Sequence, residues 1–363
     1  MLVAKMKIVG RNDLLRASRH FGNSSRREFL RWLGAGTLGL AVSGCKLPSV
    51  ERAGAKQLRG IFPIAQTPFT ETDKLDLDAL VREVEFIARG RVHGFVWPQM
   101  ASEWTVLTEQ ERLDGAEAIC SAGKKVRPAI VIGVQGADMA AVRRYVTQAR
   151  KVGADAVISL PPSESADAKT LVAYYQEVGR MSDLPLFVQA VGNITVDALL
   201  EMFRTVPTMR YIKDEFGDPL TNIAMLRERT SDRLKVFSGS HGRKLIEEMS
   251  VGFSGSMPAA SLADLYAATF DLWQEGKRDE AHAMQARTMK ALDQMLMYGM
   301  EGMKYVLYQR GVFKTYAARK AKDLGFTATA AIVSGGVSAQ PLDDAGKNVL
   351  GNMVNSLKPF FRL

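Results

Sequence analysis

The sequence predicts an α/β protein, a (β/α)8 TIM barrel with additional C-terminal helices. Eight short apolar runs alternate with amphipathic helical stretches over about 200 residues, which is the order of elements in such a barrel. The first run is not followed by a Gly-rich phosphate loop of the GxGxxG or Walker type, which weakens the alternative, a doubly wound open sheet. Beyond residue 260 the pattern is helical throughout.

The expected strands are short apolar runs bounded by polar loops, as strands buried in a parallel sheet are. They cover, in order, Gly60–Gln66, Gly94–Trp97, Ala129–Val134, Ala156–Leu160, Leu186–Ala190, Arg210–Lys213, Lys235–Ser238 and Gly255–Met257.

The helices between these strands show apolar residues at helical spacing and recognisable ends. Leu77 to Arg89 carries an apolar stripe, and Thr108-Glu109-Gln110-Glu111 is a capping box that opens the second helix. Gly153, Pro207 and Gly252 punctuate helix ends. The other expected barrel helices are Ala140–Val152, Leu171–Met181, Val196–Val206, Asn222–Arg229 and Lys244–Val251. The C-terminal helices are Leu262–Gln274, Arg278–Tyr298, Gly302–Gly311 and Ala345–Phe361, the last capped by Asp343 or Asp344.

The charge is concentrated at the N-terminus. Residues 1–44 hold eight Lys or Arg and two acids, so they carry +6 of the formal +9 and leave +3 for the rest. A nearly neutral folded part gives no reason to expect a nucleic-acid partner.

The N-terminal segment predicts export. Ser25 to Leu30 contains Arg26 and Arg27 in a pattern that matches the twin-arginine signal, and the apolar run Trp32–Val42 has the length of a signal region. The run is followed by Ser43-Gly44-Cys45, which together with Val42 resembles a bacterial lipobox and makes Cys45 the candidate lipidation site. The alternative is an amphipathic N-terminus with a chance arginine pair. We expect a chain tethered by a lipid to the periplasmic side of a bacterial membrane.

The predicted domain organisation follows from these patterns. Residues 1–44 are the signal peptide with its lipobox and 45–57 are a polar tether; 58–260 form the barrel core, and 261–363 hold the last barrel helix and the C-terminal helical region.

Active residues of such barrels lie at the C-terminal ends of strands, and Lys213 at the end of the sixth strand is the first candidate. An amine that is partly removed from water can act as a nucleophile on a carbonyl and form a Schiff base. The alternative is an ion pair with Asp214 or Glu215. The same rule makes Glu103 a second catalytic candidate. It also gives candidate substrate-binding residues, namely Thr67, Ser102, Gln189, His241 and Ser256.

Several of these segments resemble the dihydrodipicolinate synthase / N-acetylneuraminate lyase family. Tyr211-Ile212-Lys213-Asp214 is similar to the family's Gly-Ile-Lys-Glu, which places Lys213 at its Schiff-base lysine. The other matching segments are Thr67-Pro68-Phe69, Phe237-Ser238-Gly239, Gly252 to Ser256 and Gly302-Met303-Lys304-Tyr305. The resemblance covers nearly all of the chain after Leu58. It implies class I aldolase chemistry on a 2-keto acid, no cofactor, and a homodimer or homotetramer.

The sequence departs from this family at two places that carry its chemistry. The family's Gly-Thr-Thr-Gly-Glu, which grips the keto-acid carboxylate, is here Gln99-Met100-Ala101-Ser102-Glu103. The family's Tyr-Tyr-Asn after the fourth strand is here Pro161 to Glu164, and Gln189 stands at a usual tyrosine position. His241 or Glu164 could transfer protons in place of the missing phenol.

Two functions remain open on this basis. One is an exported Schiff-base lyase or aldolase that acts on a 2-keto acid or a sugar-acid derivative. The other is a lipid-tethered, non-catalytic binding or scaffolding barrel. The four histidines show no paired spacing, so no metal site is expected.

Overall fold

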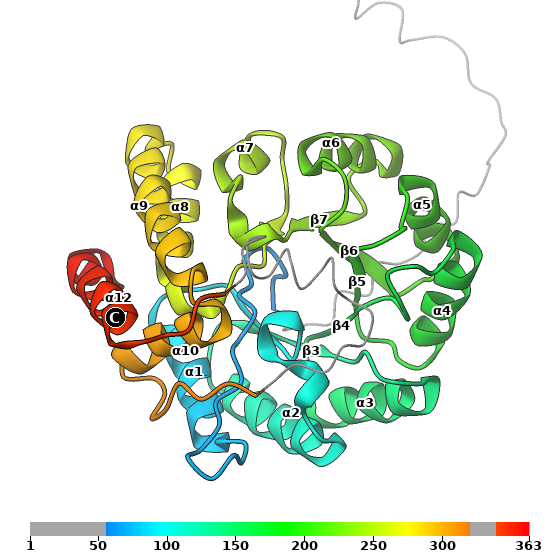
Figure 1. Cartoon of the computed structure of the whole chain (residues 1–363). Coiled ribbons are helices and arrows are strands. Elements are labelled where there is room, and N and C mark those ends of the chain that lie inside the picture. The colour runs from blue at the N-terminus through cyan, green and yellow to red at the C-terminus, as the bar shows by residue number, and fades with distance from the viewer. Residues whose placement is uncertain (1–55, 320–338, 363) are drawn as a thin grey trace, which may run out of the picture. The chain divides into compact units, whose positions relative to one another are not determined.

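The computed structural model describes residues 56–319 and 339–362. Eight parallel strands form one sheet in the order β1-β8-β7-β6-β5-β4-β3-β2, and helices surround it (Figure 1). This confirms the predicted barrel. The signal peptide with Arg26, Arg27 and Cys45, and nearly all of the 45–57 tether, lie outside the described residues, so those predictions are not tested.

The strands agree with the expected runs, most of them within one residue at each end. They are β1 Gly60–Ile61, β2 Gly94–Trp97, β3 Ala129–Gly133, β4 Ala156–Ser159, β5 Leu186–Ala190, β6 Met209–Asp214, β7 Lys235–Ser238 and β8 Gly255–Ser256. The first strand is much shorter than predicted. The chain after it still touches both neighbours, because Ile64 bridges Val96 of β2 and Ala259 beyond β8, which brings the two ends of the sheet together.

The helices follow the same alternation and continue beyond the barrel. They are α1 Leu77–Arg89, α2 Glu109–Gly123, α3 Met139–Val152, α4 Ala168–Arg180, α5 Val196–Thr205, α6 Pro219–Thr230, α7 Leu245–Ser250, α8 Ala263–Gln274, α9 Arg278–Leu296, α10 Gly299–Gln309 and α12 Asp344–Leu357. No helix in these described parts of the chain is both long enough and apolar enough to cross a bilayer.

The predicted caps are present. Thr108 accepts from the backbone N–H of Glu111 at 3.2 Å, and the Glu111 carboxylate accepts from the N–H of Thr108 at 2.9 Å. Gly153 ends α3 with φ +87°, a left-handed conformation that costs glycine little. Asp343, one of the two residues considered, caps α12. Local sequence therefore sets where these helices begin and end.

The barrel interior is filled by aromatic rings below the carboxyl ends of the strands. Phe187 stacks on Tyr211 with ring centroids 4.4 Å apart, and Phe62 meets Phe237 edge to face at 5.1 Å. Alternate residues of a strand face alternate sides, so Lys213 faces the interior with Tyr211, while Ile212 packs outside among the helices. Lys213 thus lies directly above an apolar floor.

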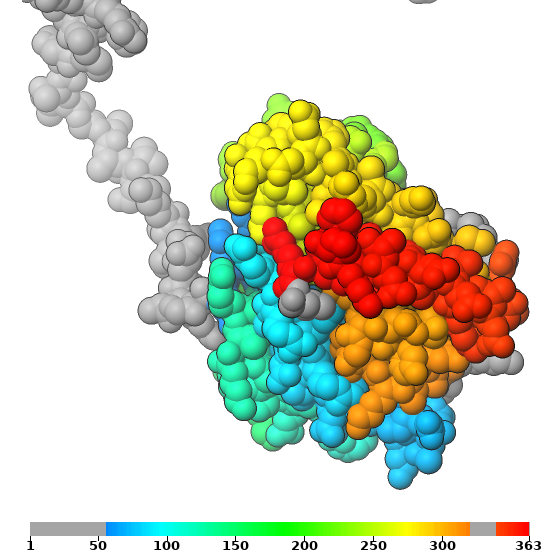
Figure 2. Space-filling model, turned by 90° about the vertical axis from the view of Figure 1, so that its left-hand side faces the viewer, coloured from blue at the N-terminus to red at the C-terminus, as the bar shows by residue number. Residues whose placement is uncertain are grey.

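The C-terminal helices are attached to the barrel by a buried ion pair. Arg310, at the end of α10, binds both carboxylate oxygens of Asp264 in α8 at 2.8 and 2.7 Å, and both side chains are 1% exposed. Figure 2 shows the C-terminal segment lying between the yellow and orange helices α9 and α10. Met295 and Met303 are buried there and fill part of the core.

Candidate active site

Lys213 lies at the carboxyl end of β6 and is 3% exposed. Its register partners are Gln189 on β5 and Phe237 on β7, so these three residues share one layer of the barrel interior. The structure therefore brings Gln189 and Lys213 together, as the rule for barrel active sites predicts.

Glu215 is the partner of Lys213. The Lys213 Nζ lies 2.9 Å from Glu215 Oε2, and the two side chains are 4% and 3% exposed. The same carboxylate oxygen accepts a hydrogen bond from Gln189 Nε2 at 2.6 Å. The sequence analysis gave an ion pair with Asp214 or Glu215 as the alternative to a reactive amine, and the structure contains the pair with Glu215. Side chains alternate between the two faces along an extended chain, so Lys213 and Glu215 lie on the same side and Asp214 lies on the other. Glu215 and not Asp214 can therefore reach the Lys213 amine.

The turn after β7 is shaped around the Glu215 carboxylate. A Cβ added to Gly239 would lie 2.2 Å from Glu215 Cγ, so only glycine leaves room there. The next two residues, Ser240 and His241, have left-handed backbone with φ of 50° and 54°. The N–H of Ser240 lies 3.4 Å from Glu215 Oε1. His241 is 7% exposed, and its carbonyl accepts a hydrogen bond from the Tyr266 hydroxyl at 2.6 Å.

Thr67 and Ser102 use their hydroxyls within the protein. Thr67 donates to the Ser102 carbonyl at 2.5 Å and accepts from the Trp97 indole at 2.9 Å. Ser102 donates to the Ala65 carbonyl at 2.5 Å and accepts from the Gln99 N–H at 3.0 Å. Each hydroxyl thus already has a donor and an acceptor partner. Substrate binding by these two residues stays a prediction.

Glu103 is held by two residues of the C-terminal region. It forms a buried ion pair with Lys304 of α10, and it accepts a hydrogen bond from the Arg319 backbone N–H at 2.8 Å. Burial raises the pKa of Glu103 and lowers that of Lys304, each partly offset by the other's charge. Both carboxylate oxygens are therefore engaged. This geometry favours a role for Glu103 in holding its loop, and its catalytic role stays a prediction.

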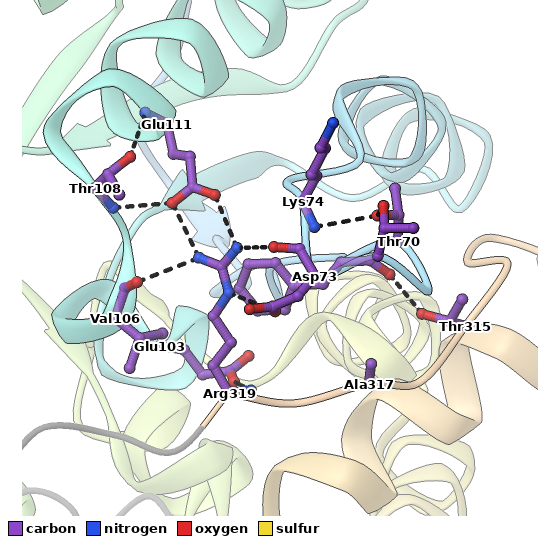
Figure 3. Close-up of polar contacts among 12 residues, drawn as sticks. Thr70, Asp73, Lys74, Glu103, Val106, Thr108, Glu111, Thr315, Ala317 and Arg319 are labelled. Atoms are coloured by element: carbon purple, nitrogen blue, oxygen red, sulfur yellow. Dashed lines mark hydrogen bonds and ion pairs between the residues drawn. The ribbon is translucent and has the colours of Figure 1, made fainter.

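Arg319 fastens that loop from outside (Figure 3). Its guanidinium binds both oxygens of Glu111 at 3.0 and 2.9 Å, and Asp73 Oδ1 at 2.8 Å. It also lies over the ring of Phe69, 3.9 Å from the centroid. The loop after β2 and the capping box of α2 are thus held in place by a residue more than 200 positions further along the chain.

Ser256 belongs to a different layer. It is paired in register with Ser238, which is paired with Asp214, and this layer faces the surrounding helices. The Ser238 hydroxyl donates to Ser256 at 3.1 Å and also contacts Glu248 of α7. Burial raises the pKa of Glu248 and of Asp214 to about 7 each. The structure does not bring Ser256 together with Lys213.

Two tyrosines of α4 pack between this helix and the end of β4, outside the barrel interior. Tyr174 and Tyr175 of α4 hydrogen-bond to the hydroxyl and the carbonyl of Ser159 at 2.8 and 3.0 Å. Burial raises the pKa of Tyr174 to about 12 and that of Tyr175 well above its ordinary value. On the other side of the strand ends, an apolar cluster gathers Trp104, Leu160 and Val191, with Met100 against it. Neither tyrosine is placed to serve as a phenolic acid for Lys213.

Sequence reasoning named Lys213, Gln189 and Glu103 and gave Glu215 only as a possible ion-pair partner. The spacing of two residues within a strand was the signal that could have promoted Glu215 to a site residue. Lys304 appeared only within a matching segment, and Arg319 carries no local signal. Among the described residues, no three His, Cys, Asp or Glu side chains gather in a way that could hold a metal ion.

Comparisons with known proteins agree with this architecture. Residues 57–322 match the Dihydrodipicolinate synthetase family. The chain is similar to the L-2-keto-3-deoxyarabonate dehydratase of Azospirillum brasilense, with 25% identity over 62% of this chain and 75% of the relative. It is also similar to the 4-hydroxy-tetrahydrodipicolinate synthase of Methanosarcina acetivorans, with 26% identity over 56% and 70% of the two chains. The crystal structure of dihydrodipicolinate synthase from Rhodopseudomonas palustris shares the fold, with a TM-score of 0.71 and 22% identity over 84% of this chain and 97% of that one.

Proposed function

The chain belongs to the dihydrodipicolinate synthetase family, and from that premise we propose that it is a lyase that forms a Schiff base between Lys213 and a 2-keto acid or a 2-keto sugar-acid derivative. The named relatives, a dehydratase and a synthase, support a lyase-type enzyme.

One observation carries the proposal, the environment of Lys213. Its amine is almost completely removed from water at the carboxyl end of β6, above an aromatic floor and 2.9 Å from a carboxylate. A strand end of a barrel is where catalytic side chains gather, and a positioned amine with a proton acceptor beside it can add to a carbonyl.

The proposed substrate class follows from the residues that replace the family's carboxylate-binding threonine pair, Met100 and Ala101. Met100 packs with Trp104, Leu160 and Val191, so this edge of the strand ends is apolar. That change favours a substrate other than pyruvate with a simple aldehyde. The dehydratase among the relatives makes 2-keto-3-deoxy sugar acids the first compounds to try.

The test is borohydride trapping on a chain lacking residues 1–45. The protein is incubated with pyruvate and a panel of 2-keto sugar acids, reduced, and analysed by intact and peptide mass. Lys213→Ala is the specific variant, and Lys235→Ala is the matched control, since Lys235 opens the neighbouring strand and pairs with Asp232 at the surface. We expect an adduct on the Lys213 peptide that only Lys213→Ala removes. An adduct that survives in Lys213→Ala would contradict the proposal.

A non-catalytic binding barrel is the second candidate function. The lost threonine pair and phenol favour it, as do the Thr67 and Ser102 hydroxyls that are already engaged within the protein. It predicts calorimetric binding of a 2-keto sugar acid that persists in Lys213→Ala, with no trapped adduct in the unaltered chain.

We further propose that the protein is exported folded and tethered by a lipid at Cys45 on the periplasmic side, and that it assembles as a dimer or tetramer. The Arg26-Arg27 pair, the apolar run and the terminal cysteine support the first part. Palmitate labelling that is lost in Cys45→Ala would test the anchor. Light scattering would test the assembly, and a monomer would contradict it.

A further inference from the structure

Schiff-base formation needs a group that moves protons at the lysine nitrogen, and this chain lacks the family's phenol. Four other acids and hydroxyls near the strand ends are bound elsewhere in the protein. Glu103 is held between Lys304 and the Arg319 backbone, and Asp214 accepts a hydrogen bond from Asn222 of α6. The hydroxyls of Thr67 and Ser102 are also bound to the protein.

The carboxylate of Glu215 is in direct contact with the nitrogen that would react. Its Oε2 lies 2.9 Å from Lys213 Nζ, within the range of a proton-transferring hydrogen bond. Gln189 donates to the same oxygen at 2.6 Å, which orients the carboxylate. Gly239 leaves the space that the Glu215 side chain occupies. Strands β5, β6 and β7 therefore all contribute to fixing this one group.

We propose that Glu215 is the general acid–base catalyst of Schiff-base formation at Lys213, with Gln189 as its positioning residue. This inference rests on the proposed function. Glu215 takes the place of the missing phenol by approaching the amine from the lysine's own strand.

The proton movements balance within the pair. Lys213 gives one proton to Glu215, and its lone pair bonds to the keto carbon while the carbonyl electrons move to oxygen. Glu215 returns that proton to the alkoxide and takes a second proton from nitrogen, which leaves a neutral carbinolamine. It then protonates the hydroxyl, which departs as water while the nitrogen lone pair forms the C=N bond.

The charge of the buried pair is the same before and after this sequence. An ammonium beside a carboxylate becomes an iminium beside a carboxylate, and water is the only other product. Net charge is costly to create in a site with a floor of aromatic rings. A reaction that starts and ends with one cation and one carboxylate therefore suits this environment. The ion pair seen in the structure is thus also the arrangement that the iminium requires.

The test measures the rate of adduct formation with cyanoborohydride from pH 6 to 9, using the compound from the trapping panel that labels the unaltered chain. General acid–base catalysis contributes about 10²–10⁴-fold, so Glu215→Gln should slow labelling by that factor across this range. The adduct should still reach the Lys213 peptide at long times. Glu215→Asp should restore part of the rate.

Two further variants separate catalysis from structure. Gly239→Ala keeps both charges but displaces the Glu215 carboxylate, and it should slow labelling as Glu215→Gln does. Glu247→Gln removes an exposed carboxylate of α7 far from these roles, and as the matched control it should leave the rate within about threefold. Thermal unfolding of each variant accompanies the kinetics.

The outcomes distinguish this inference from the proposed function. Absence of any adduct in the unaltered chain contradicts the function. An adduct that forms at the normal rate in Glu215→Gln, or an equal loss of rate in Glu247→Gln, overturns the role of Glu215 and leaves the Schiff base standing.

Discussion

The buried carboxyl group of Glu248 should make the protein less stable as pH rises from 4.5 to about 7. Glu248 is 2% exposed, and burial raises its pKa from 4.5 to about 7, helped by the nearby charge of Asp214. Ser238 and Lys244 act in the opposite direction and offset only part of this rise. Between these two pH values the folded chain therefore holds a proton that the unfolded chain has released.

The sign and size follow from proton linkage. A raised folded-state pKa contributes stability that is complete below the unfolded value and is lost as pH rises through the folded value. At about 1.4 kcal/mol per pH unit, the rise to about 7 corresponds to roughly 3 kcal/mol. Because Glu248 and Asp214 titrate together, we expect on the order of 2–3 kcal/mol for removing Glu248 alone.

Urea unfolding of Glu248→Gln and of the unaltered chain at pH 5 and pH 8 would measure this. The stability of the variant relative to the unaltered chain should improve by about 2–3 kcal/mol between the two pH values. Glu247→Gln is the matched control, since this exposed neighbour in α7 should show no such change. A relative stability of Glu248→Gln that is the same at both pH values would refute the reasoning.

Three other predictions concern the described core. Lys304→Met should lower the free energy of unfolding, measured in urea, by about 3–5 kcal/mol, because it leaves Glu103 buried without its cation. Adding Glu103→Gln should recover most of that loss, and equal losses in the single and double variants would contradict this account. Arg319→Ala should speed backbone amide exchange in residues 99–107 while β4 exchanges as before, which hydrogen-exchange mass spectrometry would reveal as a local change. Burial raises the pKa of Cys120 to about 12. In the folded chain lacking residues 1–45, this thiol should therefore resist a thiol reagent at pH 8, and it should react once urea unfolds the chain. Rapid labelling of the folded chain would count against its burial.

The fold could be predicted from the sequence because its signals are local and repeated. The runs at Gly94–Trp97, Leu186–Ala190 and Lys235–Ser238 coincide with β2, β5 and β7, since a buried parallel strand is apolar along its whole length. The first strand was predicted too long because Pro63, which has no backbone N–H to donate, interrupts the regular ladder, although the buried chain continues and Ile64 still bridges both neighbours.

The candidate site was only partly predictable. Lys213 stood out because an ammonium at the end of an apolar strand is unusual, and the strand-end rule gave it a location. Lys304 and Arg319 could not be assigned, because their partners Glu103 and Glu111 lie about 200 residues earlier and nothing in the local pattern points to them. The outward orientation of Ser256 depended on the phase of a two-residue strand, which a run of small residues does not fix.

The contacts between the C-terminal region and Glu103 determine when the loop after β2 can complete its folding during synthesis. The loop after β2 emerges from the ribosome early, yet its carboxylate gains its partners only when residues 304 and 319 have been synthesised, the latter 216 positions later. Folding from the N-terminus can build strands and helices as they appear, but this loop must wait for contacts of high sequence separation. A nascent or truncated chain that ends before α10 would therefore contain Lys213 without a finished site around it.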